Sequence, residues 1–233
     1  MRPYYEHAGI TIFHGDCREI LPTLPRVDLV LTDPPYGINA GDQRRQKSRT
    51  KLALARDYGA NDWDVKPIEW DLLFSIISMG ENAICFGGNY YPFPPSSCWL
   101  VWDKDNGAND FADCELAWTN LKKAVRRIKF RWAGMLQENM GARKEIRYHP
   151  TQKPIPVITW AIQQAPDDCG IILDPFMGSG TTLVAAKQLG RSAIGIELEE
   201  KYCEIAAKRL SQEVLPLVAE AREIKQVALG LGK

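Results

Sequence analysis

An acidic residue, two prolines and an aromatic residue follow one another at the end of an apolar segment. The segment VDLVLT, residues 27–32, leads into Asp33-Pro34-Pro35-Tyr36. Two consecutive prolines fix φ at about −65° and remove both amide donors, so a strand cannot continue through them. Their carbonyls are left pointing outward beside a carboxylate, and ligands of open α/β sheets bind beyond the carboxyl ends of strands. The alternative is a rigid turn with Tyr36 packed on the core.

These residue types suit chemistry on an aromatic amine. The exocyclic nitrogen of adenine or cytosine is a poor nucleophile because its lone pair is delocalised into the ring. A carboxylate and a backbone carbonyl that accept its two N–H bonds would localise this lone pair and stabilise the positive charge that develops on alkylation. Tyr36 offers a face on which a base turned out of a helix can stack.

A glycine-rich turn forms a second motif. Residues 170–183 (GIILDPFMGSGTTL) comprise an apolar segment, Asp174, two glycines and a helix start, and glycines here let the backbone approach a ligand closely. The next apolar segment ends in Glu197, and an acid at that position commonly hydrogen-bonds ribose hydroxyls. The alternative is that both acids are helix caps or surface residues. Leu183 replaces the third glycine of the dinucleotide fingerprint, which disfavours a nicotinamide cofactor, and the P-loop pattern is also missing.

Short apolar segments alternate with amphipathic segments, which predicts an α/β fold with a mostly parallel sheet and helices on both faces. Strands are expected over residues 10–14, 27–32, 83–86, 98–102, 115–118, 125–132, 170–173 and 192–196. Helices are expected over 17–24, 67–79, 154–165, 181–189, 199–212 and 214–231. Pro67 is expected in the first turn of the second helix. In the strand at 125–132, cations alternate with apolar residues, so one face is expected to be solvated and basic.

A single domain is expected over residues 1–233, because no linker or composition shift divides the chain. Two long segments, 37–62 and 133–150, are expected to be loops, and such loops are usually functional or disordered. The six cysteines include no C-x-x-C pair, which argues against a zinc site and a disulfide framework, and most lie in apolar runs typical of the core. No secretory signal or long apolar run occurs, which predicts a cytoplasmic protein.

Charge is balanced overall but clustered locally. The chain carries 29 basic and 29 acidic residues, which argues against nucleic-acid binding through bulk charge alone. Residues 43–56 and 122–131 are nevertheless rich in Lys and Arg and contain no acid. A neutral protein can therefore still present a basic face.

Three motifs together resemble the amino-group DNA methyltransferases of bacteria and phages: the Asp33–Tyr36 tetrapeptide, HPTQKP at 149–154 and DPFMGSGTT at 174–182. Their order resembles the β class of that family, in which the catalytic tetrapeptide precedes the cofactor loop, and the likeness covers about residues 9–212. It implies a circularly permuted Rossmann-like sheet. It also implies methyl transfer from S-adenosylmethionine to a flipped-out base of double-stranded DNA. N6 of adenine is the expected target, because N4-cytosine enzymes usually carry Ser at the first tetrapeptide position.

The resemblance also implies site residues. Catalysis is assigned to Asp33, Pro34, Pro35 and Tyr36. Contacts with S-adenosylmethionine are expected from Asp16, Cys17, Asp33, His149, Thr151, Lys153, Asp174, Pro175, Phe176, Gly178, Ser179, Gly180, Thr181, Thr182, Glu197 and Leu198. DNA contacts are expected from Arg44, Arg45, Lys47, Arg49, Lys51, Arg127, Lys129, Arg131, Arg143 and Lys144, and no metal is expected.

Within the cofactor set, the resemblance places Glu197 at the ribose and Asp16 at the adenine ring. The segment 149–154 is expected at the methionine end, where Lys153 suits a carboxylate. Residues 86–89 resemble the segment near the target pocket.

Other interpretations stay open. The target is N4 of cytosine in the nearest alternative, and RNA or a protein glutamine in the next, although the motif order counts against the latter. A DNA-binding relative without catalysis is a third, and the intact Asp33, Tyr36 and Asp174 argue against it. Many β-class enzymes are dimers, which suggests a homodimer. The chain would act as an orphan or phage methylase, or as the modification half of a restriction–modification pair.

Overall fold

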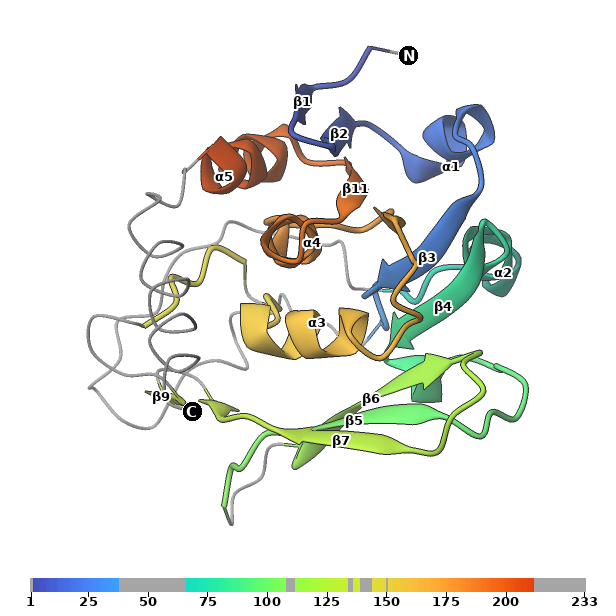
Figure 1. The fold of residues 1–233 in the computed structure, drawn as a ribbon, viewed down its shortest axis with the longest axis vertical. Coiled ribbons are helices and arrows are strands. Elements are labelled where there is room, and N and C mark those ends of the chain that lie inside the picture. Colours follow the sequence, from blue (N-terminus) through green and yellow to red (C-terminus); the bar gives the residue numbers. More distant parts are fainter. Residues whose placement is uncertain are drawn as a thin grey trace, which may run out of the picture.

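The computed structural model describes residues 2–37, 66–107, 112–133, 136–138, 144–149 and 151–211. Within these ranges one large sheet dominates the fold (Figure 1). Its strands lie in the order β1 (Tyr5–His7), β2 (Ile10–His14), β11 (Ser192–Glu197), β10 (Ile171–Asp174), β3 (Val27–Thr32), β4 (Gly80–Phe86), β6 (Cys114–Thr119), β5 (Trp99–Asp103) and β7 (Arg126–Lys129).

The middle of the sheet is parallel. Strands β2, β11, β10, β3 and β4 all run in one direction, so their carboxyl ends meet at one edge. Strand β6 runs antiparallel to β4 and to β5, which brings the beginning of β6 and the end of β5 to that same edge. The predicted α/β class with a mostly parallel sheet is confirmed, and the strands that come last in the sequence lie in its centre.

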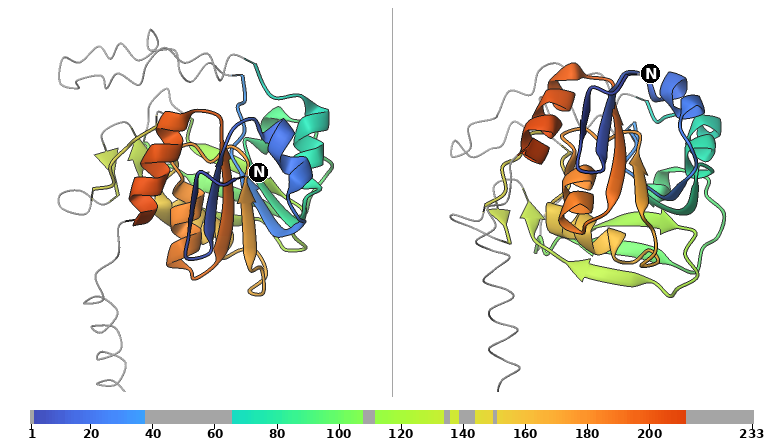
Figure 2. Two further views of the ribbon diagram at one scale, coloured as in Figure 1. Left: turned by 90° about the horizontal axis from the view of Figure 1, so that it is seen from above. Right: turned by 45° about the horizontal axis from the view of Figure 1, so that its top comes forward.

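Helices cover both faces of the sheet (Figure 2). On one face lie α3 (Ile155–Ile162), α4 (Thr181–Gln188) and α5 (Glu200–Ser211), and on the other lie α1 (Cys17–Ile20) and α2 (Trp70–Ile77). Strand β4 shows why both layers form. Its residues Ile84 and Phe86 pack into the core under α3 and α4, whereas Ala83 and Cys85 pack into the core under α2. Each fully buried aliphatic side chain contributes about 1.5–3 kcal/mol.

Most predicted elements are found with small shifts at their ends. The strands predicted at 10–14 and 27–32 have the observed bounds of β2 and β3. The predicted solvated face of β7 is confirmed, because Arg127, Lys129 and Arg131 are exposed while Trp132 is buried. Five of the six cysteines are buried, as expected for core residues. No helix in the described ranges is long and apolar enough to cross a bilayer.

Some boundaries were predicted wrongly. The helix expected at 67–79 begins at Trp70, and Pro67 instead forms an isolated β-bridge with Tyr36. The strand expected at 125–132 ends at Lys129. A separate β8 (Trp132–Ala133) follows and pairs with β9 (Leu136–Gln137).

Other features were not predicted, or cannot be compared. Strand β1 and the 3₁₀ turn Gly88–Tyr90 had no expected counterpart, whereas the helix expected at 17–24 is divided into α1 (Cys17–Ile20) and the 3₁₀ turn Leu21–Thr23. The helix expected at 214–231, most of the loop at 37–62 and parts of the loop at 133–150 lie outside the described residues.

The start of α4 depends on close backbone packing. Gly180 caps this helix with φ +78°, in the left-handed region that favours glycine. A Cβ at Gly180 would lie 2.7 Å from Cβ of Ala206 in α5. Gly190 has a similar φ of +69°, but a Cβ there would meet nothing within 4 Å. The two glycines therefore differ in packing and hardly at all in backbone conformation.

This difference predicts unequal costs of substitution. Gly190→Ala should lower the free energy of unfolding by about 1 kcal/mol, the cost of a left-handed alanine. Gly180→Ala should cost roughly 2–4 kcal/mol, because steric overlap with α5 adds to the backbone term. Urea unfolding of both variants measures this, and equal losses would contradict the packing argument. In the Gly180→Ala background, Ala206→Gly should destabilise less than it does alone.

Candidate active site

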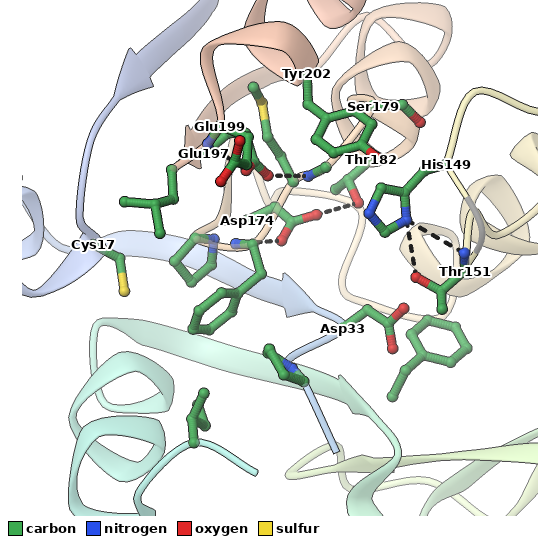
Figure 3. Close-up of a pocket in the computed structure, with 18 of the residues that line it drawn as sticks. Cys17, Asp33, His149, Thr151, Asp174, Ser179, Thr182, Glu197, Glu199 and Tyr202 are labelled. Atoms are coloured by element: carbon green, nitrogen blue, oxygen red, sulfur yellow. Dashed lines mark hydrogen bonds between the residues drawn. The ribbon is translucent and has the colours of Figure 1, made fainter. Parts of the chain in front are cut away.

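A cavity of about 510 Å³ opens at the edge where the parallel strands end (Figure 3). Its wall is formed by residues 15–18 after β2, Asp33 and Pro35 after β3, the glycine-rich turn after β10, and residues 197–199 after β11. Part of the segment 149–153 closes another side. This volume lies within the range of small-molecule sites.

Almost all predicted cofactor residues line this cavity. They are Asp16, Cys17, Asp33, His149, Thr151, Lys153, Asp174, Pro175, Phe176, Gly178, Ser179, Thr181, Thr182, Glu197 and Leu198. Gly180 does not line it and instead lies against α5. Of the predicted catalytic residues, Asp33 and Pro35 line the cavity, whereas Pro34 and Tyr36 do not.

Several lining residues were missed by sequence reasoning. Ile68, Glu69 and Leu72 come from the beginning of the α2 region, and Tyr202 comes from α5. These residues belong to ordinary amphipathic segments, so nothing in their local sequence marks them. Only the tertiary packing of α2 and α5 around the strand ends brings them to the cavity.

Asp174 holds the glycine-rich turn in place. Its Oδ2 accepts a hydrogen bond from Oγ1 of Thr182 at 2.6 Å, and its Oδ1 accepts one from the amide of Phe176 at 3.2 Å. Oγ1 of Thr32, the last residue of β3, lies 3.3 Å from Oδ1 and links the two strand ends. Burial outweighs these hydrogen bonds and raises the pKa of Asp174 to about 7.

Glu197 is also held by backbone amides. The amide of Gly178 donates to its Oε2 at 2.9 Å, and the amide of Glu199 donates to its Oε1 at 2.8 Å. Burial raises the pKa of Glu197 despite these bonds. Asp16 differs, because it caps α1 by accepting from the amide of Arg18, whose guanidinium hydrogen-bonds the carboxylate and lowers its pKa. Asp16 therefore both caps a helix and faces the cavity.

The segment 149–153 is tied to the glycine-rich turn. Oε1 of Gln152 accepts from the amide of Tyr148 at 2.8 Å and from Oγ of Ser179 at 3.1 Å. Nδ1 of His149 lies 3.0 Å from Oγ1 of Thr151. Burial lowers the pKa of His149 to about 4, so its ring is neutral near pH 7.

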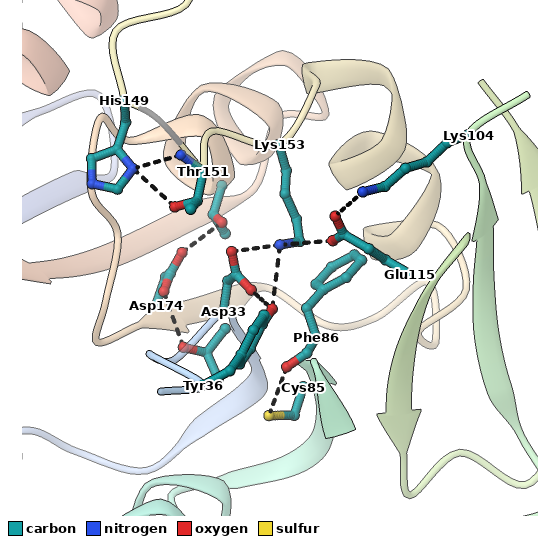
Figure 4. Close-up of polar contacts among 12 residues, drawn as sticks. Asp33, Tyr36, Cys85, Phe86, Lys104, Glu115, His149, Thr151, Lys153 and Asp174 are labelled. Atoms are coloured by element: carbon teal, nitrogen blue, oxygen red, sulfur yellow. Dashed lines mark hydrogen bonds and ion pairs between the residues drawn. The ribbon is translucent and has the colours of Figure 1, made fainter. Parts of the chain in front are cut away.

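Asp33 lies at the centre of a charged cluster (Figure 4). Its Oδ1 accepts a hydrogen bond from the Tyr36 hydroxyl, and its Oδ2 lies 2.5 Å from Nζ of Lys153. The same Nζ lies 3.1 Å from Oε2 of Glu115 in β6, and Nζ of Lys104 lies 2.6 Å from Oε1 of Glu115. From the resemblance, Lys153 was expected to pair with a carboxylate of the cofactor. In the structure its ammonium contacts Asp33 and Glu115.

The ring of Tyr36 is held by its surroundings. A Cβ at Gly87 would overlap this ring, so a glycine is required for the ring to approach the end of β4. On another side, the ring of Tyr90 stacks on Tyr36 with centroids 5.1 Å apart and planes 15° from parallel. The Tyr91 hydroxyl donates to the carbonyl of Pro35 at 2.5 Å. The segment 86–91 thus packs directly on the Asp33–Tyr36 tetrapeptide.

Three predicted DNA-binding cations lie on or after β7. Each forms an ion pair with Asp103, the last residue of β5, or with Asp105 just after it. Arg127 lies 3.7 Å from Asp103, whereas Lys129 and Arg131 lie 2.9 and 2.6 Å from Asp105. The side chains stay exposed, and surface ion pairs of this kind contribute little free energy. These cations therefore remain accessible to other anions.

The other predicted DNA-binding residues are mostly not described. Lys144 is exposed. Arg44, Arg45, Lys47, Arg49, Lys51 and Arg143 lie outside the described residues.

Comparison with known proteins gives matches over most of the chain. The family described as DNA methylase matches residues 95–208. The Type II methyltransferase M.ScaI of Streptomyces caespitosus is 28% identical, over 93% of this chain and 86% of the relative. The Type II methyltransferase M2.LlaDCHI of Lactococcus lactis subsp. cremoris is also 28% identical, over 91% of this chain and 93% of the relative.

Solved structures share the fold. The M1.HpyAVI–SAM complex aligns with a TM-score of 0.52 and 24% identity, over 86% of this chain and 99% of that chain. The PvuII DNA methyltransferase, described as cytosine-N4-specific, aligns with a TM-score of 0.57 and 16% identity, over 92% of this chain and 90% of that chain. The resemblance predicted from the three motifs is confirmed, because the chain is similar to DNA methyltransferases of the N6-adenine and N4-cytosine family.

Proposed function

We propose that this DNA methyltransferase transfers a methyl group from S-adenosylmethionine to N6 of an adenine turned out of double-stranded DNA. The observation that carries the proposal is the shared cavity. The cavity is lined by Asp33, an expected acceptor for the amine. It is also lined by Asp174 and Glu197, which are expected to contact the cofactor. When bound, S-adenosylmethionine would supply an electrophilic methyl group, so that the S–C bond breaks as the N–C bond forms, and the nitrogen would then release a proton to solvent.

The cavity fits a ligand with the mixed chemistry of S-adenosylmethionine. Glu197, at the end of β11, presents a carboxylate suited to ribose hydroxyls. Asp174, at the end of β10, offers negative charge for an ammonium group. Phe176, Ile68 and Leu198 supply apolar surface for a flat ring. The residues at the ends of the strands therefore match the separate parts of the cofactor.

Asp33 and a proline carbonyl would act on the amine. The carbonyl of Pro35 already accepts the Tyr91 hydroxyl. We therefore assign the second acceptor to Pro34, whose carbonyl adjoins Asp33 in the chain. Two acceptors fixed before the base arrives can stabilise the positive charge that develops on the nitrogen. Tyr36 would stack on the base.

Adenine is favoured over cytosine because the tetrapeptide begins with Asp, as in the N6-adenine enzymes that the sequence resembles. The fold does not distinguish the two, since the PvuII enzyme shares it. Expression in a host that lacks DNA methylation, followed by sequencing that detects modified bases, would identify the base and its context. Methylated cytosine would replace the adenine assignment, and unmodified DNA would favour an inactive DNA-binding relative.

DNA would lie along the edge of the sheet that carries Asp33. The exposed cations Arg127, Lys129 and Arg131 lie at or near the ends of β5 and β7, at this same edge. Contacts of such side chains with phosphates give sequence-independent affinity that falls with salt. The basic segment 43–56, dimerisation and pairing with a restriction enzyme stay predictions.

Removal of the Asp33 carboxylate tests the catalytic assignment. Asp33→Ala should lower kcat by at least about 10²–10³-fold, because one acceptor for the amine is lost. Cofactor affinity, measured by calorimetry, should change little. Methylation at the wild-type rate would exclude Asp33 as the amine acceptor.

Substitutions of Tyr36 separate stacking from hydrogen bonding. Tyr36→Ala should lower kcat/KM by roughly 10–100-fold, because each lost stacking contact with a base costs about 1–3 kcal/mol. Tyr36→Phe keeps the ring and loses the hydroxyl that donates to Asp33, so a smaller loss is expected. Methylation kinetics on one duplex measure both variants. If both lose activity equally, the ring does not stack on the base.

The raised pKa of Asp174 predicts pH-dependent cofactor binding. Its carboxyl is neutral below about pH 7 and ionised above it. Affinity should therefore rise with pH through this region, since the ionised carboxylate attracts the cationic end of the cofactor. Asp174→Asn keeps the shape and removes the titration, so it should bind on the order of tenfold more weakly at pH 8 with a flatter pH profile. Calorimetry at pH 6 and 8 would contradict the assignment if wild type and variant showed equal pH dependence.

A further inference from the structure

Four charged side chains contact one another in a row that ends at Asp33, the expected hydrogen-bond acceptor for the reacting amine (Figure 4). Lys104 contacts Glu115, Glu115 contacts Lys153, and Lys153 contacts Asp33. The side chain of Lys153 is only 7% exposed, whereas those of Asp33 and Glu115 are 24% and 28% exposed. Two acids and two cations thus alternate, and the charges of these four side chains balance.

The sheet topology creates this arrangement. Asp33 follows β3, and Lys153 comes from the segment before α3. Glu115 lies in β6, whose antiparallel direction places its early residues beyond the end of β4. The pairing of Trp102 with Glu115 then brings Lys104, just after β5, beside the carboxylate. Residues more than a hundred positions apart therefore converge from separate strands.

Asp33 has two requirements that conflict. It accepts a stronger hydrogen bond from the amine when it is ionised, and a nearby cation favours ionisation in a partly buried site. A cation paired with Asp33 alone would also occupy the carboxylate and cancel its charge. A second carboxylate that shares the cation reconciles the two requirements.

We propose that Glu115 is a positioning residue for methyl transfer: it shares the Lys153 ammonium with Asp33, so that Asp33 stays ionised yet can accept a hydrogen bond from the target amine. The inference rests on the proposed function, because it concerns the same reaction. Lys153 moves its contact from Asp33 towards Glu115 when the amine enters. Lys104 holds the other oxygen of Glu115 and keeps its carboxylate facing this site.

The electrostatics of the cluster agree with this role. Desolvation lowers the pKa of Lys153, but the charges of Asp33 and Glu115 outweigh it and raise the pKa, so the side chain is a cation. Desolvation raises the pKa of Glu115, but Lys153 and Lys104 outweigh it and hold the pKa at about 2. Both partners of the shared ion pair are therefore charged throughout the neutral range.

Other groups around Lys153 complete its surroundings. The Tyr36 hydroxyl lies 3.4 Å from Nζ, and the Phe86 ring centroid lies 4.9 Å from it. His149 interacts with Lys153 electrostatically and is neutral near pH 7. Burial raises the pKa of the Cys85 thiol, and the charges of Asp33, Lys153 and Asp174 also act on this group. Of the groups named here, Asp33 and Glu115 are the acids in contact with Lys153, and Asp174 titrates in every variant proposed below.

Opposite pH effects of two single variants test the proposal. Glu115→Gln keeps the size of the side chain and removes its charge. Lys153 would then bind Asp33 alone, so kcat at neutral pH should fall on the order of tenfold while the acid limb of the pH profile shifts down. Lys153→Met leaves two carboxylates without their shared cation, so Asp33 becomes harder to ionise and the acid limb should shift up by about one pH unit.

The double variant measures the coupling between the two side chains. Glu115→Gln with Lys153→Met removes both the competing cation and its second partner. Its kcat should exceed that of Glu115→Gln alone, whereas independent losses would multiply. Glu204→Gln removes an acid from an exposed pair with Lys208 and should leave kcat and its pH profile unchanged. Thermal melting of every variant monitors folding.

The outcomes separate the inference from the proposed function. A wild-type protein that methylates no DNA amine overturns the proposed function. An active wild type with unchanged kcat and pH profile in Glu115→Gln overturns the inference alone, as would acid limbs that shift in the same direction in both single variants. If Glu115→Gln does not fold, the acid limb of Lys153→Met still decides, because a limb that stays in place contradicts the shared cation.

Discussion

The parallel pairing of β3 with β10 is the constraint on which the site depends. Ile172 lies opposite Leu29 and Leu173 opposite Val30, so the two strands end nearly level. Asp174 and the Asp33 segment consequently leave the sheet side by side, although more than half of the chain separates them in sequence. The hydrogen bond from Thr32 to Asp174 joins these strand ends directly. A slip of β10 by one residue relative to β3 would turn Asp174 towards the opposite face of the sheet.

The site gathers acids where solvent is scarce, and this affects stability as well as chemistry. Burial raises the pKa of both Asp174 and Glu197, so ionisation of either group is less favourable than it would be in water. Backbone amides and Thr182 offset part of that cost. The ammonium group of Lys153 likewise offsets part of the cost of burying the Asp33 carboxylate. Ligand-binding sites commonly retain such unfavourable groups because function requires them.

Much of the fold could be predicted from the sequence, because the apolar segments were short and sharply bounded. The strands at 10–14 and 27–32 were predicted with their observed bounds, and the glycine-rich turn and tetrapeptide marked two walls of the cavity. The start of α2 was misplaced because Pro67, a good first residue for a helix, instead pairs with Tyr36. Local sequence could not reveal that tertiary contact.

The partners of the charged residues were the hardest feature to predict from the sequence. Glu115 lies in an ordinary strand, and only the antiparallel turn of the sheet at β6 brings it to Lys153. The same cause explains why Lys153 was paired with a cofactor carboxylate. The cations of β7 were recognised from their alternation, but their acidic partners Asp103 and Asp105 come from a strand more than twenty residues earlier. Pairings between distant strands leave no trace in a local pattern.

The apolar wall of the cavity has a thermodynamic consequence. Leu198 is 63% exposed although it lines the cavity, and Phe176 and Ile68 contribute further apolar surface beside it. A flat ring that covers this wall removes it from water, and such burial gives a negative heat-capacity change. The enthalpy of ligand binding would therefore become more favourable as temperature rises, while the affinity itself varied much less. Enthalpy would contribute more to binding and entropy less at higher temperature, without a change in contacts.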